Sequence, residues 1–152
     1  MPTDRQDQIN AIEALFQQLT WRGRMRFSHR LERYGLTMPQ YLALAKIQKL
    51  GPDATMSEVS DALLLPRSSM TSIADRLVDQ GLVRRGSLET DRRAVSATIT
   101  PAGTELIRTV EAERNAELTA MLADLTTADL GEFARLLGKL LDSLQQLPAD
   151  DG

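Results

Sequence analysis

Apolar residues recur at three- and four-residue spacing along most of this chain, which is the pattern of amphipathic α-helices. The first run predicts a helix of more than twenty residues that stops at Gly35, and the second predicts a helix from Thr37 to Gly51. Two further runs predict long helices that begin at the capping residues Thr100 and Thr126. The two ends of the chain are therefore expected to be helical.

The stretch from residue 55 to residue 80 predicts two shorter helices with a break between them. Thr55 and Glu58 form a capping box for the first, whose buried face is expected to hold Met56, Val59, Ala62 and Leu63. Pro66 must break the helix because it lacks an amide hydrogen and restricts the residue before it. The second helix would then bury four residues, namely Met70, Ile73, Ala74 and Leu77.

A β-hairpin is predicted directly after these helices. Residues 82–85 form its first strand, 86–90 its turn and 94–100 its return strand, in which apolar and polar residues alternate as in a sheet with one solvated face. Two helices across a tight break, followed by a hairpin, are the parts of a winged helix-turn-helix. Such a motif presents one helix to the DNA major groove and the hairpin to its flank.

From Met56 to Gly103 the chain resembles the multiple-antibiotic-resistance-regulator (MarR) family of bacterial transcription regulators, without an internal gap. The matching segments are Ser68-Ser69-Met70-Thr71, Asp75-Arg76-Leu77, Gly81-Leu82-Val83, Asp91-Arg92-Arg93 and Ile99-Thr100-Pro101-Ala102-Gly103. Two residues depart from the family pattern: Leu64 stands where the turn often has glycine, and Pro66 where a serine or threonine cap is common.

The expected fold class is mainly α with a small β-wing, in a single domain over residues 1–152. A winged helix-turn-helix region at 37–100 would be flanked by dimerisation helices at 8–35 and 101–147. The outer helices carry more apolar surface than a motif of about fifty residues can cover, which favours a homodimer. The resemblance implies the same arrangement, and a helical cap on a monomer is the alternative.

Charge and composition restrict the classes of function that the chain could have. The net charge is −3, yet residues 21–93 hold 13 Lys and Arg against 8 Asp and Glu, whereas residues 94–152 hold 4 against 10. Positive charge therefore lies where DNA would be read. No cysteine and one histidine leave no thiolate or multi-histidine metal site, and neither catalytic constellations nor a phosphate-binding glycine loop are present. We expect no enzyme activity, no cofactor, no membrane span and a cytoplasmic location.

A symmetric dimer would place two recognition helices in successive major grooves of double-stranded DNA, so the operator should be pseudo-palindromic. The base-edge candidates on the second helix are Arg67, Ser68, Ser69, Thr71 and Ser72, with Arg76 on phosphate. Arg67 is the best candidate for specificity because arginine can bind guanine with two hydrogen bonds. The protein is expected to act as a repressor.

The hairpin supplies a second set of DNA-binding candidates, namely Arg84, Arg85, Arg92 and Arg93. Arg92 and Arg93 can enter the electronegative minor groove. The resemblance implies that Asp91 braces the hairpin and that Arg93 makes the minor-groove contact. An ordinary solvated hairpin face is the alternative interpretation, and a winged-helix protein-interaction module without DNA binding is the alternative function.

The resemblance also implies a small aromatic or phenolic effector, bound in a cleft between the dimerisation and DNA-binding parts. The candidate lining residues lie on and just after the first helix: Trp21, Met25, His29, Tyr34, Met38 and Tyr41. His29 could hydrogen-bond a carboxylate or phenol. Packing and solvated positions are the alternative interpretation of all six.

Overall fold

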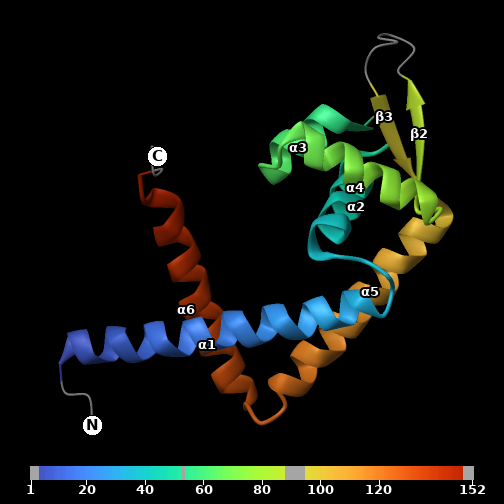
Figure 1. Ribbon diagram of the computed structural model, residues 1–152. Helices are drawn as coiled ribbons and strands as arrows, with labels where there is room; N and C mark the ends of the chain where they lie inside the picture. Colours follow the sequence, from blue (N-terminus) through green and yellow to red (C-terminus); the bar gives the residue numbers. More distant parts are fainter. Residues whose placement is uncertain (1–3, 53, 88–94, 149–152) are drawn as a thin grey trace. The chain divides into compact units, whose positions relative to one another are not determined.

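A computed structural model describes residues 4–52, 54–87 and 95–148 of the chain (Figure 1). Its elements are α1 (Arg5–Glu32), α2 (Met38–Leu50), β1 (Ala54–Thr55), α3 (Met56–Leu63), α4 (Arg67–Asp79), β2 (Val83–Ser87), β3 (Val95–Ile99), α5 (Pro101–Met121) and α6 (Thr127–Gln146). The chain divides into two compact units, Met1–Ala112 and Glu113–Gly152, and α5 spans the boundary. The expected fold class, mainly helical with a small sheet, is confirmed.

Three helices begin where the capping signals predict. In each case the backbone N–H of a threonine donates to a side-chain oxygen three residues later, at 2.9 Å for Thr37 and Thr55 and at 3.0 Å for Thr126. The acceptors are Gln40, Glu58 and Asp129. The predicted stops are also confirmed, since Gly35 and Gly81 follow α1 and α4 in the left-handed region, with φ of 68° and 70°.

The turn between α3 and α4 passes through a left-handed residue that is not glycine. Leu64, with φ of 52°, caps α3, and Pro66 caps α4 in extended conformation. The buried hydroxyl of Ser60 donates to the Leu65 carbonyl oxygen at 2.6 Å. Ser60 therefore occupies the inner face of α3, and the expectation that Ala62 is buried is wrong: Ala62 lies beyond the edge of that face and is exposed.

The sheet has three antiparallel strands in the order β1-β3-β2. β1 was not predicted from the sequence; its two residues pair with Ser96 and Ala97 of β3. Because β3 is the central strand, Ser96 is covered by its neighbours and is buried. The prediction that Ser96 lies on the solvated face of the return strand is therefore wrong. β2 continues through residues 86 and 87, which had been expected in the turn. Residues 88–94, with the rest of that turn, lie outside the described residues.

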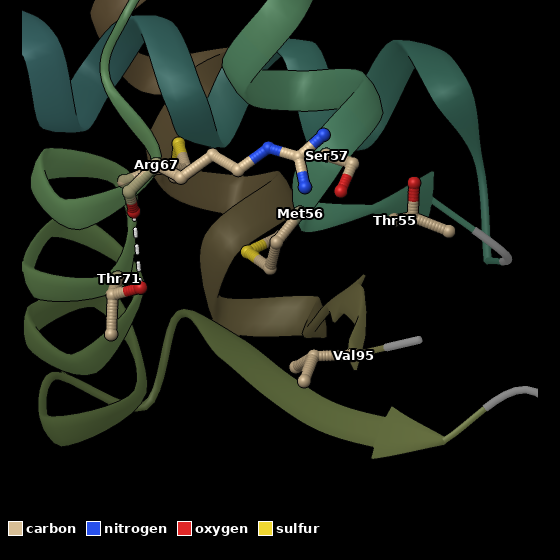
Figure 2. Close-up of a pocket in the computed structure, with 7 residues that line it drawn as sticks. Thr55, Met56, Ser57, Arg67, Thr71 and Val95 are labelled. Carbon is tan, nitrogen blue, oxygen red and sulfur yellow. Dashed lines mark hydrogen bonds between the residues drawn. The ribbon is translucent and has the colours of Figure 1, made fainter. Parts of the chain in front are cut away.

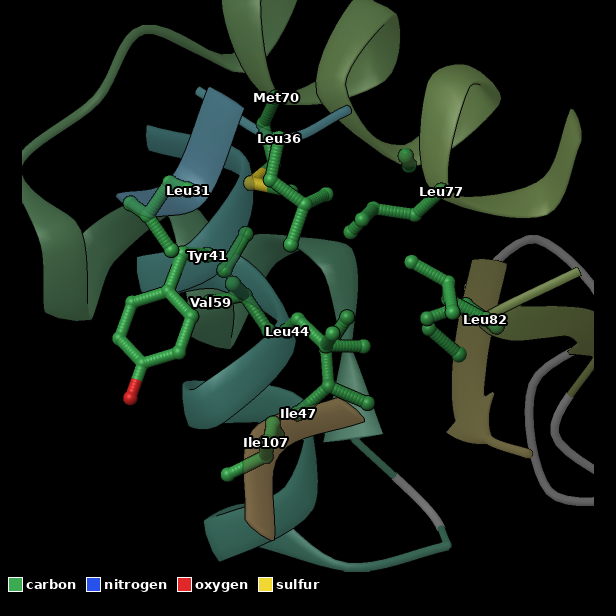
Figure 3. Packing of buried hydrophobic residues seen from close by; sticks show 14 of the residues in the cluster. Leu31, Leu36, Tyr41, Leu44, Ile47, Val59, Met70, Leu77, Leu82 and Ile107 are labelled. Carbon is green, nitrogen blue, oxygen red and sulfur yellow. The ribbon is translucent and has the colours of Figure 1, made fainter. Parts of the chain in front are cut away.

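The core of the first unit joins the end of α1 to α2, α3, α4, the sheet and the start of α5 (Figure 3). Its largest fully buried side chains are Leu31, Leu36, Leu44, Ile47, Val59, Met70, Leu77, Val83, Ile107 and Val110. These contacts pack α4 and the β2–β3 hairpin against the same hydrophobic core. The positions of α4 and the wing are therefore fixed by packing that begins in α1.

Long apolar stripes remain uncovered on α1 and α6. On α1 they comprise Ile9, Ile12, Leu15, Phe16 and Leu19, and on α6 they comprise Leu130, Phe133, Leu136, Leu137, Leu140, Leu141 and Leu144. α6 has no buried residue at all among those that the structure describes. Leu15 is 66% exposed and Leu144 is 64% exposed, although leucines at these helical spacings are normally buried. Exposed apolar faces of this extent are typical of surfaces that take part in further packing.

Candidate nucleic-acid interface

The outer face of α4 is polar, short-chained and exposed. Met70, Ala74 and Leu77 face the core, which at about 100° per residue turns the opposite side of the helix to solvent. On that outer side lie Ser68, Ser69, Ser72 and Arg76, all exposed. When the opposite side of a helix is packed against the core, exposed hydroxyl and guanidinium groups can reach base edges and phosphates in a major groove.

Arg67 and Thr71 lie beside this outer face, at the wall of a groove between α4, α3 and β3 (Figure 2). The groove has a volume of about 380 Å³ and is lined by Thr55, Met56, Ser57, Arg67, Met70, Thr71 and Val95. Figure 2 shows the Arg67 guanidinium extending across the groove towards Ser57. The Thr71 hydroxyl donates to the Arg67 carbonyl oxygen at 3.1 Å. These two residues border the groove, whereas the other α4 candidates face outwards.

The two arginines of β2 have different surroundings. Arg85 lies opposite Ala97 in the β2–β3 pair and Arg84 lies opposite Thr98, so their side chains leave opposite faces of the hairpin. The Arg85 guanidinium pairs with the Asp75 carboxylate of α4 at 2.7 Å. It also donates to the Thr71 carbonyl oxygen at 3.4 Å. Both arginines are exposed, but Arg85 is turned towards α4.

Three wing candidates, Asp91, Arg92 and Arg93, lie outside the described residues. The strands that lead to them are well anchored. Arg84 and Arg85 occupy the middle of β2, and Val95 opens β3 with an exposed side chain. The described strand residues on either side of positions 88–94 are therefore held in the sheet.

The six effector candidates have dissimilar environments. Trp21 and Met25 are exposed on α1, and the exposed His29 lies 3.2 Å from Glu32. Tyr34 and Met38 are partly buried against the core, and Tyr41 is buried, with its ring edge-on to Phe27 at 5.2 Å between centroids. None of the six lines the groove beside α4.

The groove between α4, α3 and β3 was not predicted from the sequence. Its apolar residues, Met56, Met70 and Val95, have the spacing of core positions, and all three were assigned to buried faces. Only the exposure of Val95, at 46%, marks the gap between the sheet and α4. No signal in the sequence could have shown that gap, because it depends on how the hairpin meets α3 and α4.

Two other kinds of site, a metal centre and a membrane span, are absent from the described residues. In residues 4–52, 54–87 and 95–148, no cluster of three or more His, Cys, Asp or Glu could hold a metal ion. None of the helices in these ranges combines the length and hydropathy needed to cross a membrane.

Comparison with known proteins assigns the chain to a family. A sequence model of the MarR family matches residues 34–94, which include α2, α3, α4 and β2. The uncharacterized HTH-type transcriptional regulator YsmB of Bacillus subtilis (strain 168) is 31% identical over 116 residues, which are 76% of this chain and 79% of that protein.

Solved structures agree with this assignment. The chain matches YusO of Bacillus subtilis with a TM-score of 0.82 and 26% identity, over 92% of this chain and 99% of the other. A variant of MepR from Staphylococcus aureus matches in fold, with a TM-score of 0.70 and 19% identity over 88% and 97% of the two chains. This chain belongs to the MarR family of transcriptional regulators, and α3, α4 and the β2–β3 hairpin are its DNA-binding winged helix.

Proposed function

We propose that this protein binds double-stranded DNA sequence-specifically, as a homodimer on a pseudo-palindromic operator, and represses transcription in the cytoplasm. The observation that carries the proposal is the outer face of α4, where serines and Arg76 are exposed on a helix whose other side is fully packed. A fold relative supports it, since a Staphylococcus aureus MepR variant was solved bound to an oligodeoxyribonucleotide.

Homodimer formation follows from the uncovered stripes on α1 and α6. Burying apolar surface gains about 25 cal/mol per Å², and exposed patches of this extent on a regulator mark an interface. An identical copy supplies the same stripes, so a two-fold axis lets each subunit cover the other. Two recognition helices would then meet half-sites about one helical turn apart, roughly 34 Å.

The DNA contacts divide by position. Ser68, Ser69 and Ser72 on the outer face of α4 are proposed to contact base edges, and Arg76 to contact phosphate. Arg67 and Thr71, at the groove wall, are proposed to contact bases at the edge of the half-site. On the wing, Arg84, Arg92 and Arg93 are proposed to contact the minor groove and its phosphates, with Asp91 bracing the tip.

Release from DNA by a small aromatic or anionic effector is the last part of the proposal. Trp21, Met25 and His29 are exposed along one side of α1, where an aromatic ring and an imidazole could hold such a ligand. Tyr34, Met38 and Tyr41 would connect that ligand to the core. Aromatic acids that bind here should raise the midpoint of thermal unfolding, and a series that gives no shift would remove the effector from the proposal.

An electrophoretic shift with the DNA that flanks the protein's own gene tests the proposal directly. We expect a discrete shifted band that weakens steeply as the salt concentration rises. Arg93→Ala should weaken the band and reduce the salt dependence without changing the fold or the dimer. Absence of a shift with every duplex at low ionic strength would contradict DNA binding and favour the protein-interaction module.

A further inference from the structure

Among the described residues of β2 and β3, Arg85 is the charged residue on the side that faces the helices. Its register partner, Ala97, is fully buried, and Val83, two residues earlier on the same face of β2, is buried as well. An arginine at this position is directed towards α4 by the pleat of the sheet, whereas Arg84 is directed the other way. The geometry of β2 therefore separates two adjacent arginines into two roles.

The target of Arg85 on α4 is a carboxylate flanked by a backbone carbonyl. Asp75 accepts from the Arg85 Nη2 atom at 2.7 Å, and the Thr71 carbonyl oxygen lies 3.4 Å from the same atom. Thr71 and Asp75 are one helical turn apart and so lie on the same side of α4. That side faces the wing, while Ser72 and Arg76 lie further round the helix, towards solvent.

We propose that Arg85 is a positioning residue which braces the wing against the recognition helix through Asp75, and that it does not bind DNA phosphate. This inference rests on the proposed function. The brace sets the angle between the hairpin that approaches the minor groove and the helix that enters the major groove. It also neutralises Asp75, an acid that would otherwise repel the DNA backbone from α4.

Both ends of the brace are held before the ion pair forms. β2 is paired with β3 along its whole length, and α4 is packed through Met70, Ala74 and Leu77. Pairing two groups on rigid elements costs less side-chain entropy than pairing two free surface chains. The Asp75 side chain is 55% exposed and the Arg85 side chain 38% exposed, so the pair serves mainly to fix orientation and adds little to the stability of the fold.

The two possible roles of Arg85 predict opposite effects of removing the acid. If Arg85 binds DNA phosphate, Asp75 competes with the phosphate for the Arg85 guanidinium. Asp75→Asn should then leave operator affinity unchanged or increase it. If Arg85 acts through Asp75, the same substitution releases the wing and weakens binding. Asp79→Asn is the matched control, because it removes the same charge from α4 one turn further along, where the residue is exposed.

The experiment measures operator affinity across a salt titration for the wild-type protein, Asp75→Asn, Asp79→Asn, Arg85→Met and the double variant. Circular dichroism and sedimentation check that each variant is folded and keeps its assembly state. We expect Asp75→Asn and Arg85→Met each to weaken binding about three- to tenfold, with the double variant no weaker than either. Asp79→Asn should bind at least as tightly as the wild type. The salt slope of Arg85→Met should equal that of the wild type, since no phosphate contact is lost.

The outcomes separate this inference from the function on which it rests. Tighter or unchanged binding by Asp75→Asn, additive losses in the double variant, or a slope reduced by about one in Arg85→Met would each overturn the brace while leaving DNA binding intact. A wild-type chain that shifts no duplex would overturn the proposed function, and the brace with it.

Discussion

The side-chain amide of Gln80 donates a 2.7 Å hydrogen bond to the carbonyl oxygen of Gly35, 45 residues earlier in the chain. Gln80 caps the C-terminus of α4, and Gly35 lies in the turn between α1 and α2. The bond therefore ties the end of the recognition helix to the turn that leaves the proposed dimerisation helix. Together with the buried Leu31 and Leu36 on either side of that turn, the bond fixes the C-terminal end of α4 against the end of α1.

Gln80→Met should destabilise the fold by about 0.5–1.5 kcal/mol, because it keeps the side-chain length but removes the donor. Urea unfolding measures the change as a lower midpoint with an unchanged slope. Gln48→Met is the control, since Gln48 is exposed on α2 and the change should stay within about 0.5 kcal/mol. Equal losses in the two variants would show that the bond to Gly35 contributes nothing specific.

Gly103→Ala should destabilise the fold by about 1–3 kcal/mol. A Cβ at position 103 would collide with the Leu82 carbonyl oxygen, which is backbone and cannot move aside, and would lie 2.8 Å from Ile99 Cγ1. Thermal unfolding measures the loss. Gly138→Ala on α6, where no atom lies within 4 Å, should instead stabilise the helix by about 0.5–1 kcal/mol. A stabilised Gly103→Ala protein would contradict the close approach of α5 to residue 82.

Leu64→Gly should raise stability, because Leu64 has a φ of 52° and its side chain is 92% exposed. A left-handed conformation costs an ordinary residue about 1–2 kcal/mol, and glycine avoids this cost. Glycine in turn loses more backbone entropy on folding, which offsets about 0.5–1 kcal/mol of the gain. Little burial is lost. The net gain of about 0.5–1 kcal/mol should appear as a higher midpoint of thermal unfolding. A lower midpoint would indicate that the exposed leucine has an unrecognised packing role.

The capping box of α3 should make stability depend on pH in the acid range. The backbone N–H of Thr55, and secondarily its hydroxyl, hold the pKa of Glu58 below its ordinary value of 4.5. A lowered folded-state pKa means that the stabilisation is complete above about 4.5 and is lost as the pH falls through the lower, folded value. Glu58→Gln cannot titrate, so the wild type should lose stability relative to this variant as the pH falls below 4.5. A difference that does not change with pH would refute this role of Glu58.

Local signals predicted most of the helical framework. Thr37, Thr55 and Thr126 begin helices because each has a partner three residues later, and this depends only on neighbouring residues. β1 was missed because two residues carry no periodicity, and Ala97, which pairs with Ala54, lies 43 positions further along the chain. The burial of Ser96 was missed for the same reason, since it depends on a third strand.

The candidate site was predicted less completely than the fold. The exposed serines of α4 follow from the buried stripe of the same helix, so their direction could be predicted. Arg85 was grouped with the DNA contacts because its pairing with Asp75 depends on how the hairpin packs against α4. The alternation of a strand separates Arg84 from Arg85, but the group that Arg85 meets is known only from the tertiary structure.

We propose that two copies of this chain, joined through the apolar stripes of α1 and α6, bind one operator together. Sedimentation equilibrium, with the protein alone and with a duplex that it shifts, measures this directly. We predict a dimer in the absence of DNA and two chains on each duplex, at protein concentrations where a duplex with only one half-site binds far more weakly. A single chain in solution, or one chain bound equally well to half-site and full operator, would contradict it.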